Sequence, residues 1–110
     1  MEEPNADVMD YIWESASFDG IILFEFMAAL REHGSPGSAT TENAGKLAAH
    51  LVRTGKLIPG RLGVDAFEPW ELPAEEAAQR IENEVSRFVA EGRKLSLGDV
   101  AHFMPAKWNS

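Results

Sequence analysis

Residues 41–70, TENAGKLAAHLVRTGKLIPGRLGVDAFEPW, decide the fold of this chain. Their first half carries apolar residues at the i, i+3, i+4 and i+7 positions of one helix face: Ala44, Leu47, Ala48 and Leu51. Thr40 or Thr41 can cap the start of such a helix, and Gly55 fits the position just past its end. We therefore predict an amphipathic helix over residues 41–54.

The period of the sequence changes after Gly55. Residues 56–70 alternate apolar groups with turn residues, which predicts a short β-hairpin, and Pro59-Gly60 is a dipeptide typical of a turn. A helix followed by a glycine-containing hairpin is the arrangement of a winged-helix domain. We expect an α+β fold, mainly helical and winged-helix-like, with four helices and either a β-hairpin or a three-stranded sheet.

Three further helices are predicted from apolar spacing and from proline and glycine at their ends. They cover residues 6–15, 21–33 and 73–91, with a turn at 17–20 and a loop at 34–40. Residues 97–104 can form either a helical turn or a third strand beside the hairpin. We favour a turn followed by a strand over 100–104.

Length and composition bound the class of protein. A chain of 110 residues with 45% hydrophobic content can build one core, so we expect a single domain over residues 1–110 with a frayed start at 1–5. No apolar run approaches the roughly 20 residues that span a bilayer, so we expect no membrane partner. The acidic N-terminus differs from the basic start of a secretory signal, and the absence of cysteine suits the reducing cytoplasm.

No pattern in the chain indicates catalysis or cofactor binding. The three histidines do not form HExxH, no GxSxG motif occurs, and no glycine pattern matches a phosphate-binding loop. We therefore predict no enzymatic activity, no catalytic residues, no cofactor and no metal site.

The formal net charge of −8 points to a positively charged macromolecular partner, since an acidic chain repels a phosphate backbone. Acidic residues dominate the first predicted helix and the aromatic segment before the long helix. Our candidate partner-binding residues are Asp7, Asp10, Glu14, Asp65, Glu68, Trp70, Glu71 and Glu75. The other interpretation is that the carboxylates form a solvated surface and that Trp70 anchors the long helix to the hairpin.

A basic island, which we define as residues 43–64, interrupts the acidic sequence: it holds four lysines and arginines and no acid. The island places Lys46, His50 and Arg53 at the i, i+4 and i+7 positions of the predicted helix, and Lys56 and Arg61 on the hairpin. These residues could present a recognition helix and a wing to DNA. The other interpretation is that these bases pair internally with Glu68, Glu71 or acids of the first helix.

The second half of the chain resembles the small acidic immunity proteins of bacterial toxin–immunity systems. The stretches that carry the resemblance are Leu57-Ile58-Pro59-Gly60, Phe67-Glu68-Pro69-Trp70 with the helix Ala74–Val89, and Leu97-Gly98-Asp99-Val100-Ala101. The resemblance implies a cytoplasmic, non-enzymatic binder that neutralises a basic toxin, and the basic island departs from this picture. A DNA-binding regulator is the alternative, and a homodimer is a third interpretation.

Overall fold

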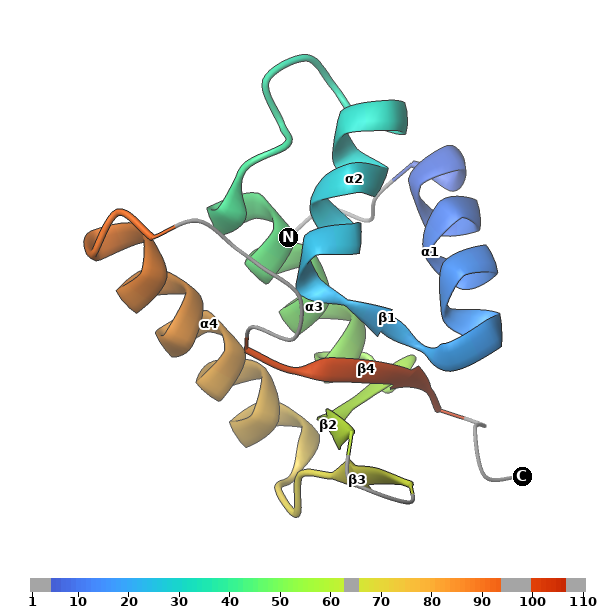
Figure 1. The fold of residues 1–110 in the computed structure, drawn as a ribbon, viewed down its shortest axis with the longest axis vertical. Helices are drawn as coiled ribbons and strands as arrows, with labels where there is room; N and C mark the ends of the chain where they lie inside the picture. The colour runs from blue at the N-terminus through green and yellow to red at the C-terminus, as the bar shows by residue number, and fades with distance from the viewer. Residues whose placement is uncertain (1–4, 63–65, 94–99, 107–110) are drawn as a thin grey trace.

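The computed structural model describes residues 5–62, 66–93 and 100–106 (Figure 1). Its elements in chain order are α1 (Ala6–Asp19), β1 (Ile21–Ile22), α2 (Leu23–His33), α3 (Thr41–Arg53), β2 (Leu57–Leu62), β3 (Phe67–Pro69), α4 (Ala74–Ala90) and β4 (His102–Pro105). The predicted class, α+β and mainly helical, is confirmed. The predicted frayed segment, residues 1–5, lies outside the described residues except for Asn5. The Asn5 side-chain oxygen accepts a hydrogen bond from the Val8 N–H at the start of α1 (2.8 Å).

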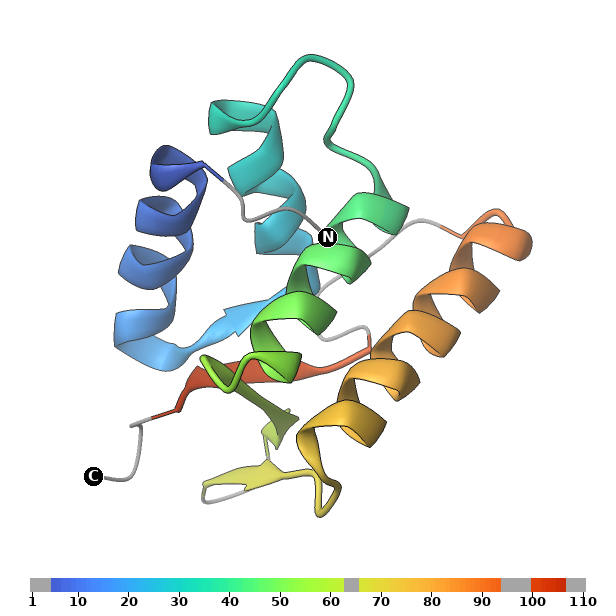
Figure 2. The same cartoon turned by 180° about the vertical axis from the view of Figure 1, so that it is seen from behind.

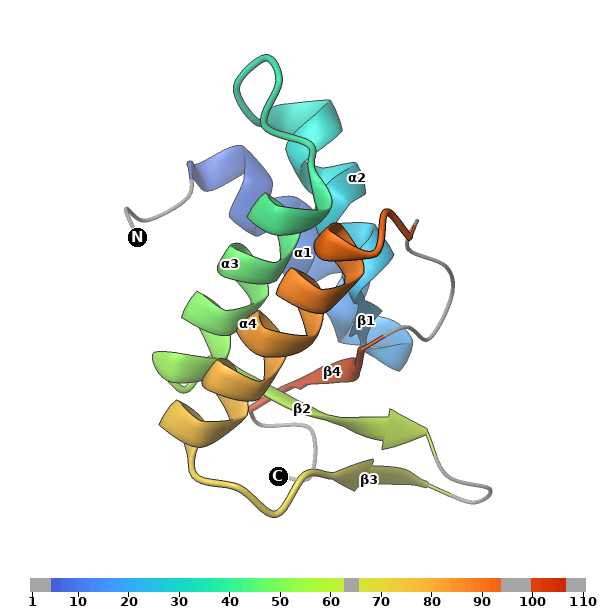
Figure 3. The ribbon, with the colours of Figure 1, turned by 90° about the vertical axis from the view of Figure 1, so that its left-hand side faces the viewer.

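Helix α3 lies between α4 and α2, and its predicted apolar stripe is buried. Seven of its residues are buried: Ala44, Gly45, Leu47, Ala48, Ala49, Leu51 and Val52. It packs along α4 on one side and against α2 on the other (Figure 3). Thr40 caps its start by accepting from the Asn43 N–H, and Gly55 follows its end with a φ of 77°. The predicted helix boundaries therefore hold within one residue.

The four strands form one antiparallel sheet in the order β1-β4-β2-β3. The predicted hairpin is present as β2 and β3, but the predicted turn at Pro59-Gly60 is wrong because both residues lie inside β2. The Pro59 carbonyl accepts a hydrogen bond from the Trp70 N–H (3.0 Å), just past the end of β3. Proline has no N–H to donate, and this missing donor falls where the pairing of β2 with β3 ends. A Cβ on Gly60 would collide with the Phe67 ring, so this glycine allows a close contact between the strands.

Two predictions for the N-terminal half are corrected. The first helix continues to Asp19, past the predicted end at residue 15 and through most of the predicted turn at 17–20. Ile21 and Ile22 form β1 instead of starting the second helix, because β4 offers them a partner: they pair with Phe103 and His102. The sheet therefore has four strands, one more than the three that we expected at most.

The C-terminal half follows the prediction more closely. Helix α4 begins at Ala74 and ends at Ala90, within one residue of the predicted range 73–91 at each end. The favoured strand near 100–104 is present as β4, which pairs with β2 of the hairpin; residues 97–99 lie outside the described part. Phe26 of α2 packs edge-on against Phe103 of β4, with ring centroids 5.3 Å apart, and joins the helices to the sheet.

Candidate protein-binding site

The corner between β3 and α4 brings together a half-buried aromatic residue, Trp70, and an exposed apolar one, Leu72. Trp70 directly follows β3, and its N–H donates to the Pro59 carbonyl, which fixes the backbone there. The guanidinium carbon of Arg80 lies 3.9 Å from the centre of the Trp70 ring, a cation–π contact between the corner and α4. The half-buried indole thus has one side on the core and one under Arg80.

A shallow depression with a volume of about 520 Å³ runs from this corner along the outer side of α4 and is open to solvent. We call it the α4 depression, and its lining residues are Leu72, Glu76, Gln79, Arg80, Asn83, Glu84 and Arg87. Leu72 is 40% exposed at one end of it. Residues from successive turns of one helix therefore build most of the surface.

Carboxylates around the corner differ in whether a cation neutralises them. Glu68 accepts from Arg61 Nε (2.6 Å), and Glu75 accepts from Arg53 Nε (2.7 Å). Among the described residues, no cation pairs with Glu71, which is exposed at the corner. Cations therefore neutralise two of the predicted carboxylates at the corner, Glu68 and Glu75. The predicted Asp65 lies outside the described residues.

The three acids of α1 lie far from this corner. Asp7, Asp10 and Glu14 are exposed on α1, which packs on α2 and β4, whereas α4 packs on α3. Figures 1 and 2, which view the molecule from opposite sides, place α1 and α4 on opposite flanks. The structure therefore divides the predicted acidic residues between two separate surfaces.

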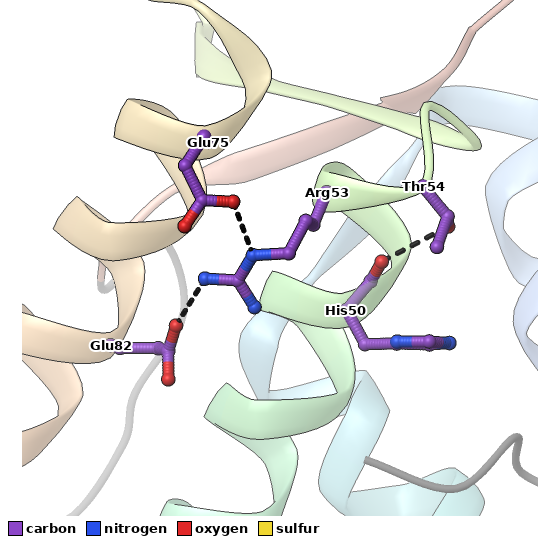
Figure 4. Close-up of polar contacts among 5 residues, drawn as sticks. All are labelled: His50, Arg53, Thr54, Glu75 and Glu82. Carbon is purple, nitrogen blue, oxygen red and sulfur yellow. Dashed lines mark hydrogen bonds and ion pairs between the residues drawn. The ribbon is translucent and has the colours of Figure 1, made fainter.

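The basic island is largely neutralised inside the chain. Arg53 donates to Glu75 through Nε and to Glu82 through Nη2, each at 2.7 Å, and so ties α3 to α4 (Figure 4). These hydrogen bonds, that to Glu75 first, raise the pKa of Arg53 above its ordinary value. Lys46 Nζ lies 3.2 Å from Oε1 of Glu42, which is one turn earlier in α3.

The remaining basic residues follow two patterns. Arg61 pairs with Glu68 across the hairpin, as the internal-pairing interpretation predicts. The carbonyl of His50 accepts from the Thr54 hydroxyl (3.0 Å), while the side chain of Lys56 is exposed. Since α3 also lies between α2 and α4, these contacts do not support a free recognition helix.

Sequence reasoning named residues beside the α4 depression, Trp70, Glu71 and Glu75, but none of the seven that line it. It left out Leu72 and the outward residues of α4. Glu76, Arg80, Asn83 and Arg87 recur at intervals of three and four, the spacing that puts residues on one helix face. This spacing, read together with the proline that starts the helix, was the available signal.

Other kinds of site find no support in the described ranges. No group of three or more His, Cys, Asp and Glu there could hold a metal ion. No helix in those ranges has the length and hydropathy that crossing a lipid bilayer requires. Comparison of the chain with protein families, with curated proteins and with solved structures found no match in any of the three.

Proposed function

We propose that this chain is a non-enzymatic protein-binding domain, an immunity-type inhibitor that neutralises a cognate toxin by direct binding in the cytoplasm. The observation that carries the proposal is the corner between β3 and α4. There a half-buried Trp70 under Arg80 and an exposed Leu72 stand beside carboxylates that no described cation neutralises.

The residue types at this corner are among those that contribute most to binding energy at protein interfaces. Tryptophan and arginine are enriched among the few residues that dominate protein interfaces, and a polar rim surrounds them. Glu71 and Glu76 supply such a rim with negative sign. A basic partner would be steered toward it by the net charge of −8.

The test uses the purified product of the neighbouring gene and titration calorimetry at low salt. The informative variant is Glu71→Lys/Glu76→Lys, which reverses two charges at the corner. The matched control is Glu32→Lys, which reverses an exposed charge on α2. We expect the double variant to weaken binding at least about tenfold, roughly 1.4 kcal/mol, while the control changes it little.

Two results would overturn the proposal. One is the absence of binding at low salt. The other is binding that survives the charge reversal at the corner but is lost in Asp7→Lys/Asp10→Lys, which would move the interface to α1. A further readout is function: the bound chain should suppress the toxic activity of the partner in a cell-growth assay.

A further inference from the structure

The outer face of α4 balances both signs of charge. Helix α4 forms one flank of the molecule (Figure 1), and its buried inner residues are Ala77, Ala78, Ile81 and Val85. Its outer face lines the α4 depression with two glutamates and two arginines, so the formal charge of this face is zero although the whole chain carries −8. Because two copies of so acidic a chain repel each other, a face with balanced charge is where they can meet at the least cost.

The positions of the lining residues along α4 are the same when read in either direction. The six lining residues that belong to α4 stand at positions 76, 79, 80, 83, 84 and 87. A two-fold axis between residues 81 and 82 therefore pairs each of them with another of the set on an antiparallel second copy. The pairs are Glu76 with Arg87, Gln79 with Glu84, and Arg80 with Asn83. Opposite charges thus meet at both ends of the face, and in the middle a guanidinium donor meets an amide acceptor.

The two charges at the ends of this face are not neutralised within the described residues. Glu76 and Arg87 are exposed, and in that part of the chain neither side chain forms an ion pair or a hydrogen bond. Glu75 and Glu82 differ, since both accept hydrogen bonds from Arg53 of α3. Glu76 and Arg87 lie about 16 Å apart along the helix, too far to pair with each other. Each is therefore available to the opposite charge of a second copy.

We propose that two copies of this chain associate through antiparallel α4 helices, with Glu76 of each copy bound to Arg87 of the other. Leu72, 40% exposed at one end of the α4 depression, is then covered by the last turn of the other α4. One face of a 17-residue helix is about 25 Å long and buries less than the roughly 1,200 Å² at which stable interfaces begin, so the association is weak.

This inference goes beyond the proposed function and does not rest on it. Leu72 and Glu76 belong both to the dimer face and to the corner between β3 and α4. A protein that binds the corner therefore competes with the second copy for the same surface.

Reversal of the two end charges tests the arrangement. Sedimentation equilibrium at about 150 mM salt, with protein up to about 1 mM, measures dimer formation by the original chain, Glu76→Arg and Arg87→Glu. In each variant alone, like charges face each other across the axis, so we expect at least about tenfold weaker self-association. In an equimolar mixture of the two variants, the introduced arginine faces the introduced glutamate and the other pair is unchanged. We expect the mixture to form a dimer of about the original strength, which a variant that merely misfolds could not do.

Arg31→Glu and Glu32→Arg, at exposed positions of α2, make the same changes in net charge and are the matched controls. Alone or mixed, they should change self-association by no more than about twofold, since salt screens the net charge.

The inference fails if the original chain stays monomeric up to about 1 mM, or if the single α4 variants associate as strongly as the original chain. It also fails if their mixture associates no better than either variant alone, or if the α2 controls weaken the dimer as much as the α4 variants do. Since every measurement uses this chain without a toxin, failure here is distinguishable from failure of the proposed function.

Discussion

Replacement of Gly45 by alanine tests whether α3 and α4 are locked together. Gly45 is buried in the middle of α3 and faces Val85 of α4. A Cβ at this position would lie 2.7 Å from both methyl groups of Val85 and 2.9 Å from its Cβ. A β-branched side chain in a helix has one strongly preferred rotamer, so Val85 cannot rotate away without strain.

Two opposing effects set the size of the change. Alanine in place of glycine inside a helix stabilises by about 1 kcal/mol. Overpacking a core costs about 1–3 kcal/mol, and the upper part of that range applies because three atoms are approached together. We therefore expect Gly45→Ala to destabilise the fold by about 1–2 kcal/mol, the opposite sign to the helix-propensity effect alone.

Urea unfolding of four proteins measures this coupling: the original chain, Gly45→Ala, Val85→Ala and the double variant. Val85→Ala alone should cost about 2 kcal/mol from lost burial. The double variant should cost less than Val85→Ala, because the new methyl group fills the vacated space, giving a coupling of about 2 kcal/mol or more. Additivity within about 0.5 kcal/mol, or stabilisation by Gly45→Ala, would refute the close packing of the two helices.

Three further predictions concern other contacts. Arg53→Gln should lower the unfolding free energy by about 1 kcal/mol or less, and by less at high salt. Because folding raises the pKa of Arg53, the stabilisation that its ion pairs give is complete at pH values below the ordinary pKa. It is lost only as the pH rises through the raised pKa. The difference in urea stability should thus be constant from about pH 7 to 10, and a fall in that range would contradict it. Gel-shift titration at low salt should show no DNA binding by the original chain or by Lys46→Glu/Lys56→Glu; a shift that the double variant abolishes would restore the DNA-binding alternative. Gly20→Ala should cost at least about 1 kcal/mol more in thermal unfolding than Gly37→Ala. Both have positive φ, but a Cβ on Gly20 would lie 2.5 Å from β4 and one on Gly37 would meet nothing, so equal losses would count against this contact.

The sequence predicts the elements whose signals are local. The stripe of α3 and the proline that begins α4 indicate their helices without knowledge of any neighbour. Pro59-Gly60 and Ile21-Ile22 were misassigned because tertiary pairing overrides local preference there: β3 packs closely over the glycine, and β4 recruits the two isoleucines.

The candidate site was predictable only in part, for the same reason. Trp70 and Glu71 stand out by composition, whereas the role of Glu75 depends on Arg53, 22 residues earlier in the chain. The contact of the Arg80 guanidinium with the Trp70 ring likewise joins residues ten positions apart in the chain. Such distances between side chains do not leave a pattern in sequence spacing.

The place of β4 within the sheet has a consequence for biosynthesis. Its residues follow every other strand in the chain, yet it lies between β1 and β2 and is the partner of β1 in the sheet. While the nascent chain is still emerging from the ribosome, the helices and the hairpin can form, but β1 must wait. The sheet can close only after translation has passed residue 105, so β1 stays without its strand partner until β4 has been made.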